Sequence, residues 1–272
     1  MLESAAYEEI AAILEEPDID RKLAAATRLT SRAEKVGLAG RDSAARAPLT
    51  ARTPARPAQW QVGGAFDQPA RPSTGSPEGR YRLMHSVANI ELSAVELALL
   101  TAADFDGFPV EYYRDWLRVA GEEVLHARKV QERLRQMGGE FGDRPIHRSL
   151  WETASAYPDP IERLGVVPRI LEARGLDVSG RLRTQLRSAG DSESANLLEL
   201  IYRDEIGHVA TGSRWFAWTC RAHGLDPESR FLDLWRDFVR ERGGRPPNLD
   251  RAGRLAAGFS ERELEGLSAA VR

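Results

Sequence analysis

Two Glu-x-x-His pairs, each preceded by a further glutamate, constrain the fold of this 272-residue chain more than any other feature. The six side chains form two groups of three: Glu91, Glu123 and His126, then Glu172, Glu205 and His208. The leading glutamate lies 32 residues before its pair in the first group and 33 residues before it in the second. Residues three apart share one helix face, and about 32 residues span a helix, a short turn and part of an antiparallel return helix. The pattern therefore predicts two helical hairpins, each carrying half of a di-metal site.

The chemistry of these six side chains predicts the kind of metal. Carboxylate oxygen and imidazole nitrogen suit iron, manganese or zinc. Di-iron carboxylate bundles take one glutamate from each of two helices and a Glu-x-x-His from each of the other two. We therefore expect an all-α, ferritin-like four-helix bundle with a long crossover that holds two metal ions. Iron is the expected metal, with manganese or a mixed iron and manganese pair as the alternatives.

Two other glutamates compete for the ligand positions. Glu96 follows Glu91 by five residues, which is about 140° around a helix, so both cannot face the same ion. The matched spacing of the two groups favours Glu91. Glu122 could take the place of Glu123, but the parallel with Glu205 favours Glu123.

Further polar side chains beside these motifs could tune a metal without binding it. Arg174 or Asp177 could hold a ligand carboxylate or imidazole, and Asp204 could accept a hydrogen bond from a metal-bound histidine. Tyr202 could be a redox or hydrogen-bonding group, with an ordinary packed tyrosine as the alternative. His85 is expected to support the site or the fold rather than to ligate.

Composition narrows the class of protein. Hydrophobic residues make up 42% of the chain and charged residues 29%, as in an ordinary soluble globular protein. The formal charge of −3 gives no broad basic field, so nucleic-acid binding is not expected. A single cysteine, Cys220, excludes an internal disulfide framework and fits a reducing cytoplasm. We see no signal-peptide pattern and no run of about 18 apolar residues, so we expect a cytoplasmic protein without a membrane span.

The order of helical and irregular stretches predicts four segments. Residues 1–37 read as an N-terminal helical segment, and the proline-rich residues 38–80 as an extended connector. The bundle is expected over residues 81–225, and a C-terminal helical extension over residues 226–272. The connector carries arginines at several positions, among them Arg41, Arg46, Arg52, Arg56 and Arg71. We expect them in a solvated linker, with binding to an anionic partner as the alternative.

Two local signals refine the helix boundaries. Pro168 falls inside the third bundle helix and predicts a kink or a late start there. The run from Ser260 to Glu263 has the pattern of a capping box and predicts a last short helix.

Several runs of residues carry a family resemblance. They are Ile90–Ala94, Leu171–Asp177, Asp204–Val209 and Arg214–Phe216, together with Gly75–Pro77 and the ending Asn248–Ser260. Over roughly residues 50–265 these runs resemble a ferritin-like family of unknown function, domain of unknown function 455. The resemblance implies a ferritin-like core that binds two metals through the six residues of the two groups. The arrangement is also similar to that of the tRNA-hydroxylating ferritin-like monooxygenases.

The leading functional hypothesis is an oxidoreductase that activates dioxygen at a di-iron centre and hydroxylates an unidentified substrate. The expected partners are dioxygen or peroxide, a small-molecule substrate and an electron donor, and a homodimer is allowed for. The first alternative is a ferroxidase or peroxide-detoxifying iron protein, although one cysteine leaves no Cys₄ electron-transfer site within this chain. The second is a non-enzymatic scaffold that the metal only stabilises.

Overall fold

The computed structural model describes residues 2–37, 48–63, 73–242 and 248–269. Helices dominate these residues, which confirms the all-α class. The chain folds as two compact units, Met1–Ser155 and Ala156–Arg272, each with its own helical hairpin. The predicted division into a bundle and three flanking segments stays a prediction.

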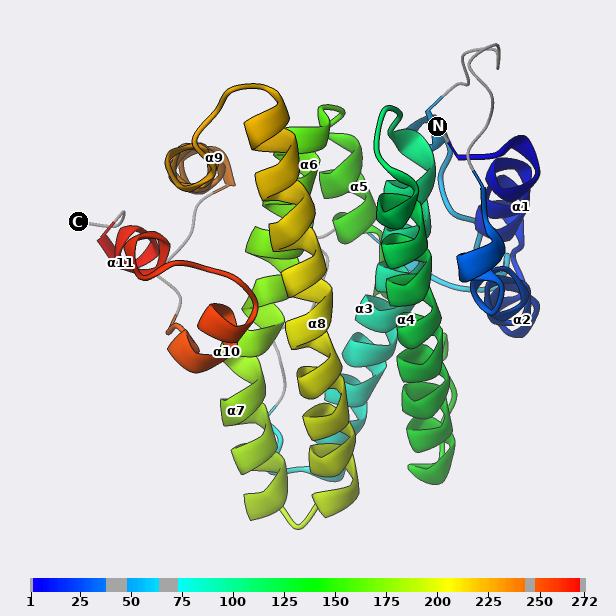
Figure 1. The fold of residues 1–272 in the computed structure, drawn as a ribbon. Helices are drawn as coiled ribbons and strands as arrows, with labels where there is room; N and C mark the ends of the chain where they lie inside the picture. The colour runs from blue at the N-terminus through cyan, green and yellow to red at the C-terminus, as the bar shows by residue number, and fades with distance from the viewer. Residues whose placement is uncertain (1, 38–47, 64–72, 243–247, 270–272) are drawn as a thin grey trace. The chain divides into compact units, whose positions relative to one another are not determined.

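The first unit is built on a hairpin of α3 (Pro77–Asp104) and α4 (Val110–Gln136), which lie side by side (Figure 1). The hydroxyl of Ser76 accepts a hydrogen bond from a backbone N–H of the first turn of α3, so the helix begins at a side-chain cap. Gly107, with a φ of 82°, takes the left-handed conformation in the turn between the helices. These local signals fix where each arm of the hairpin starts.

Two buried tyrosines fasten the closed end of this hairpin. The Tyr112 hydroxyl donates to the carbonyl oxygen of Thr101 at 2.8 Å, and the Tyr113 hydroxyl donates to that of Phe105 at 3.1 Å. Both bonds reach from α4 back to the end of α3. They set the register in which residues further along the two helices meet.

The length and composition of α3 would allow it to cross a membrane. However, 89% of its most apolar 18-residue window is buried inside the protein. This is the pattern of a core helix in a soluble protein, which is apolar because other helices surround it. The structure therefore accounts for α3 without a membrane.

Shorter elements complete the first unit: α1 (Ser4–Glu15), α2 (Ile19–Thr30), η1 (Ala33–Lys35), η2 (Leu49–Ala51), β1 (Val62–Gly63), β2 (Ile146–His147) and α5 (Ser149–Ser155). Helix α2 packs on α4, and α1 packs on α3. Strands β1 and β2 pair in parallel, with Val62 opposite Ile146. This pairing attaches the connector to the loop that follows α4.

Part of the connector is built into the first unit rather than solvated. Arg56 is buried, and its guanidinium donates to both oxygens of Glu96 on α3 at 2.6 and 2.7 Å. Lys22 on α2 donates to the same carboxylate at 2.6 Å. The expectation of a solvated linker is wrong for Arg56, because a buried carboxylate is stabilised only by buried cations or donors. Arg52 does lie at the surface, where it pairs with Glu15. Three connector arginines lie outside the described residues: Arg41, Arg46 and Arg71.

The second unit is built on another hairpin, whose first arm changes form part-way. This arm runs as α6 (Pro160–Val166), a π-helical stretch η4 (Val167–Glu172) and α7 (Ala173–Ser188). It returns as α8 (Ser192–Ala222), which lies beside α7 after a short turn (Figure 1). The kink expected at Pro168 takes the form of the π-helical stretch.

Three further helices complete the second unit: α9 (Pro227–Arg242), α10 (Arg251–Ala256) and α11 (Glu261–Ala269). The predicted capping box at the start of α11 is confirmed. The N–H of Ser260 donates to Glu263 Oε2 at 2.9 Å, and the N–H of Glu263 donates to Ser260 Oγ at 3.2 Å. Helix α10 was not anticipated from the sequence.

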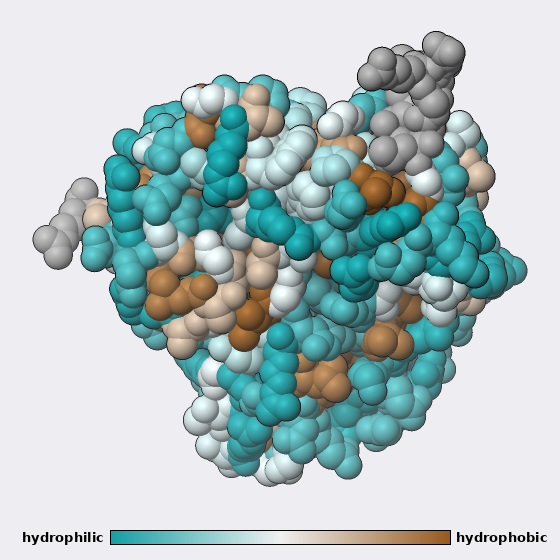
Figure 2. All heavy atoms as spheres, in the orientation of Figure 1, coloured by the Kyte–Doolittle hydropathy of each residue, from teal (hydrophilic) through white to brown (hydrophobic). Residues whose placement is uncertain are grey.

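Hydrophilic side chains predominate on the face drawn in Figure 2, and hydrophobic ones are scattered in small groups. Single apolar side chains at the surface are normal for soluble proteins. The face shown there gives no argument for a large apolar docking surface.

Candidate metal centre

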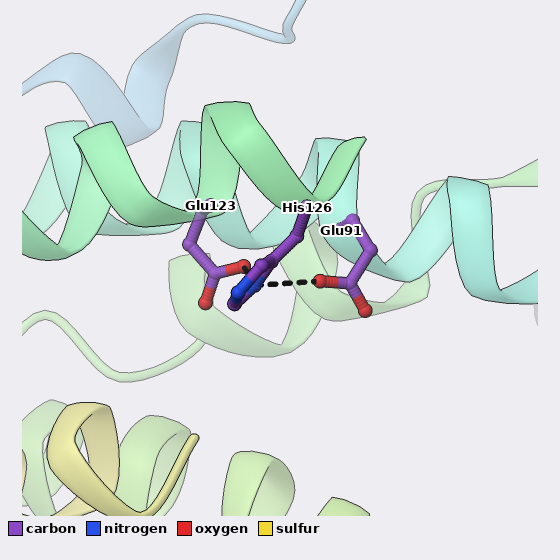
Figure 3. Close-up of side chains that lie close together, drawn as sticks. All are labelled: Glu91, Glu123 and His126. Carbon is purple, nitrogen blue, oxygen red and sulfur yellow. Dashed lines mark hydrogen bonds and ion pairs between the residues drawn. The ribbon is translucent and has the colours of Figure 1, made fainter. Parts of the chain in front are cut away.

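Three side chains of the first group meet inside the first unit. Glu91 comes from α3, and Glu123 and His126 come from α4 (Figure 3). His126 Nδ1 lies 3.3 Å from Glu91 Oε2 and 3.2 Å from Glu123 Oε2. One ligand atom from each residue lies within 4.8 Å of the others. The three side chains point toward one another in Figure 3, and each is at most 3% exposed.

Helix geometry explains this convergence. Glu123 and His126 are three residues apart, so their side chains leave the same face of α4. That face is the buried one, because Ala120, Val124 and Ala127 around it are also buried. Since α3 is buried along nearly its whole length, its glutamate meets this face in the interior of the hairpin.

The crowding of three ionisable groups shifts their proton affinities. Burial by itself lowers the pKa of His126, but hydrogen bonds and charges from Glu123 and Glu91 more than offset it and raise the pKa to about 11. Burial and the charge of Glu123 raise the pKa of Glu91 to about 7, against the opposing effect of His126. At neutral pH the two carboxyl groups therefore surround a positively charged imidazolium.

The donor set fits a metal ion. Two carboxylates and one imidazole are the oxygen and nitrogen ligands that iron, manganese and zinc accept. Bonds of about 2.0–2.2 Å from one ion could reach ligand atoms that lie this close together. The two carboxylates stabilise the positive charge of the protonated imidazole. A bound metal cation could take the place of that proton. This buried group could hold a metal ion.

The competing glutamates differ from this group in their surroundings. Glu96 is fully engaged by Lys22 and Arg56, and these cations lower its pKa against the effect of burial. Glu122 is only half-buried, whereas its neighbour Glu123 is 1% exposed. The geometry therefore favours Glu91 and Glu123 as the donors of α3 and α4.

The second group lies in the second unit. Glu205 and His208 are three apart on α8, and the carboxylate Oε2 of Glu205 lies 3.7 Å from His208 Nδ1. His208 is fully buried, and Glu205 is half-buried. Glu172 is also half-buried and is the last residue of η4, in the helical arm that precedes α8. The pair on α8 thus repeats the Glu123 and His126 pair of α4.

The four residues expected to tune the metal differ in their hydrogen-bond partners and in their exposure to solvent. The carboxylate of Asp177 accepts hydrogen bonds from the guanidinium of Arg254 at 2.7 and 2.9 Å and from the backbone N–H of Asp250 at 3.0 Å. The hydroxyl of Tyr202 donates to Asp250 Oδ2 at 2.6 Å, and this bond together with burial raises its pKa to about 12. Arg174 is exposed, and Asp204 is half-buried beside Glu205.

His85 and Cys220 are buried in the fold and are not among the expected metal ligands. His85 Nε2 accepts a hydrogen bond from the backbone N–H of Gly142 at 3.0 Å, and burial lowers its pKa to about 4. A neutral His85 therefore fastens the loop after α4, as its expected supporting role requires. Cys220 is buried, and burial raises the pKa of its thiol to about 11.

The sequence did not predict the burial of Arg169 in the second unit. Arg169 lies within η4, is 3% exposed and pairs with Glu263 at the start of α11. The nearby Pro168 was a signal that this stretch departs from an α-helix. Nothing local indicated that its arginine would be buried, because the partner lies 94 residues further along the chain.

Comparisons with known proteins define the family but name no reaction. The family model described as "Protein of unknown function (DUF455)" matches residues 15–265. A protein of Haemophilus influenzae described as "Uncharacterized protein" is 37% identical over 209 residues, which cover 73% of this chain and 71% of the relative. No solved structure matches. With most of its length matched by the family model, the chain belongs to the DUF455 family.

Proposed function

We propose that the chain is a di-metal carboxylate oxidoreductase that reacts with dioxygen or peroxide. Glu91, Glu123 and His126 would hold one side of the metal pair. The second group would hold the other side: Glu172, Glu205 and His208. Iron is the proposed metal, with manganese or a mixed pair as the alternatives.

The observation that carries this proposal is the buried Glu91, Glu123 and His126 group. Three ionisable side chains packed together without bulk water are costly unless a cation or a proton neutralises them. The buried Glu96 carboxylate of this chain uses arginine and lysine as its cations. The first group instead has a histidine nitrogen between its two carboxylates, 3.3 and 3.2 Å from their oxygens. A buried set of oxygen and nitrogen donors at this spacing supports a metal site.

The repeated pattern supports a second ion. Both hairpins carry a leading glutamate on the first arm and a Glu-x-x-His on the second, with spacings of 32 and 33 residues. Ferritin-like di-metal proteins are built from two such halves. We therefore propose a ferritin-like bundle of α3, α4, the η4–α7 arm and α8, in which the two half-sites act together. The segment with α5 and α6 would provide the long crossover.

The charge count supports redox chemistry. Four carboxylates balance two divalent ions, and a neutral reduced site favours loss of electrons. Bound iron would supply the reaction with dioxygen or peroxide. The chain's own contribution is to hold the ligands in place, to exclude water and to release the proton of His126 when the site is loaded.

Iron loading tests the proposal. The full-length protein is loaded with Fe²⁺ without oxygen, and iron per chain is measured by mass spectrometry before oxygen consumption is followed with candidate reductants. We expect two ions per chain and oxygen consumption above that of free Fe²⁺. Glu123→Gln should lose iron, while Glu132→Gln, on the exposed face of the same helix, should not.

Each outcome of this experiment is decisive. Absence of bound metal in the wild-type protein refutes the metal site. Two tightly bound ions without any reaction with oxygen or peroxide would refute the oxidoreductase assignment. They would instead support a scaffold that the metal only stabilises. Assembly into a large cage with stored iron would favour a ferroxidase.

A further inference from the structure

The stretch Val167–Glu172 interrupts a longer helix with one wider turn. The N–H of Ala173 donates to the carbonyl of Pro168, five residues back, whereas an α-helix uses the residue four back. Pro168 has no N–H, so it cannot make the α-helical bond to Leu164. Such π-helical turns are rare and often occur at functional sites. This one ends at Glu172, the leading glutamate of the second group.

The wider turn changes the direction of every side chain after it. Each residue advances an α-helix by about 100°, so one extra residue rotates the later part of the arm by about 100° relative to α6. Ala173 and Leu176 are buried after the turn. Without the extra residue, these side chains and Glu172 would face a different direction. The orientation of Glu172 therefore depends on the π-helical turn.

Helix α8 packs closely against the turn at Gly212. A Cβ atom at Gly212 would lie 2.3 Å from Cβ of Pro168, so only a residue without a side chain lets the two helices approach here. The two arms of the hairpin are antiparallel. Glu172 follows Pro168 by four residues, and His208 precedes Gly212 by four. The contact therefore sets Glu172 and His208 at about the same level of the hairpin.

Helix α11 also holds the turn. Nη2 of Arg169 donates to both carboxylate oxygens of Glu263 at 2.8 Å, and its Nε donates to Ser213 Oγ on α8 at 3.2 Å. The guanidinium lies 5.0, 4.1 and 4.5 Å from three ring centroids, those of Phe216, Phe231 and Phe259. Glu263 is itself fixed by the capping box of α11. A residue in the middle of the wide turn is thus tied to α8 and to the C-terminal helix.

We propose that Glu263 and Arg169 are positioning residues for the second metal-binding group. Their ion pair keeps residues 167–172 in the π-helical form, which keeps Glu172 in phase with the pair on α8. The inference rests on the proposed function, because it takes Glu172 as a ligand. The first group, carried by α3 and α4, does not depend on this ion pair.

Glu263→Gln in the full-length protein tests the role, since it keeps the size of the side chain and removes its charge. Binding of Co²⁺ is followed by its visible absorption, and metal per chain by mass spectrometry. We expect two ions in the wild type. In the variant one ion should keep its affinity, and the other should bind roughly 10- to 100-fold more weakly. Pro168→Ala restores an N–H and allows an α-helix, so it should weaken the same ion. Hydrogen exchange over residues 161–176 should be faster in both variants.

Glu96→Gln is the matched control. Glu96 is equally buried, and its carboxylate pairs with Lys22 and Arg56 in the first unit, which does not contain the wide turn. Removing this buried ion pair should reduce the free energy of unfolding about as much as Glu263→Gln does. Both ions should still bind with wild-type affinity. Equal metal loss in this control would show a general effect of stability and overturn the positioning role.

The two proposals fail in different ways. If Glu263→Gln and Pro168→Ala keep both ions at wild-type affinity, the positioning role is wrong and the proposed function stands. If the wild type binds no second ion, or if Glu205→Gln keeps both, the proposed function fails first.

Discussion

Metal binding to the first group should release the proton of His126, and the affinity should therefore rise with pH. The pKa of His126 is raised to about 11, so the imidazole is protonated at neutral pH and must lose a proton to become a ligand. Release of one proton makes the association constant rise about tenfold per pH unit, or about 1.4 kcal/mol. The pKa of Glu91 is about 7, so a second proton should be released below that pH. The slope of log K against pH is expected to be close to one above about pH 7.5 and to approach two near about pH 6.

The measurement needs the first group alone. A background with Glu205→Gln and His208→Gln removes the pair of the second group and leaves the first intact. Competition between the protein and a chelator for Co²⁺, from about pH 6 to about pH 8.5, gives the slope. Calorimetry in two buffers of different ionisation enthalpy counts the released protons directly. Because the groups are coupled, the counts describe the group as a whole rather than either residue.

A further substitution identifies the source of the proton. His126→Gln in the same background removes the imidazolium, so any remaining binding should lose its pH dependence above about pH 7.5. Affinity that stays constant between about pH 7.5 and about pH 8.5 in the background protein, with no proton released, would refute the reasoning. Such a result would mean that the imidazole is already neutral in the metal-free protein.

The same chemistry and packing yield four further predictions. The raised pKa of His126 contributes stability that is complete below the unfolded value of about 6.5 and is lost as pH rises toward 11. The melting temperature of the metal-free protein should therefore fall between about pH 6.5 and about pH 9, and that of the metal-loaded protein should not. Glu96→Gln leaves two buried cations without their carboxylate and should reduce the free energy of unfolding in urea by about 3–5 kcal/mol, with unchanged metal per chain. Gly212→Ala forces a methyl group against Pro168, so it should cost about 1–3 kcal/mol in the same assay and weaken one ion. Glu205→Ala should remove at least one ion, and retention of both would contradict its assignment.

The sequence predicted the features that depend on local geometry. The three-residue spacing of Glu123 and His126 required only a helix, and the structure provides one over Val110–Gln136. The capping box at the start of α11 could be predicted because Ser260 and Glu263 are only three residues apart in the sequence. Likewise, the C-terminal helical extension expected over residues 226–272 begins with α9 (Pro227–Arg242).

Features that depend on distant partners could not be predicted in this way. Arg56 belongs to a proline-rich stretch that has the composition of a solvated linker, and its burial is decided by a glutamate 40 residues later. Arg169 depends in the same way on Glu263. Pro168 indicated a break in its helix, but proline only removes an N–H, and the break can be a kink, a new start or a wide turn. In this chain the break is a wide turn, and Pro168 packs against Gly212 there.

Two glutamates on α3 show what separates a metal ligand from a structural ion in this chain. Glu91 and Glu96 are five residues apart, and both are at most 3% exposed, so burial alone does not distinguish them. The charge of Glu96 is balanced by lysine and arginine side chains, which are tied into the fold and cannot leave. The charge beside Glu91 is balanced by a proton on His126, which can leave whenever a cation arrives. Replacing the proton by a metal ion then needs no rearrangement of the hairpin. Hydrogen exchange of α3 and α4 should therefore slow on metal loading, and the same amides should be protected before and after.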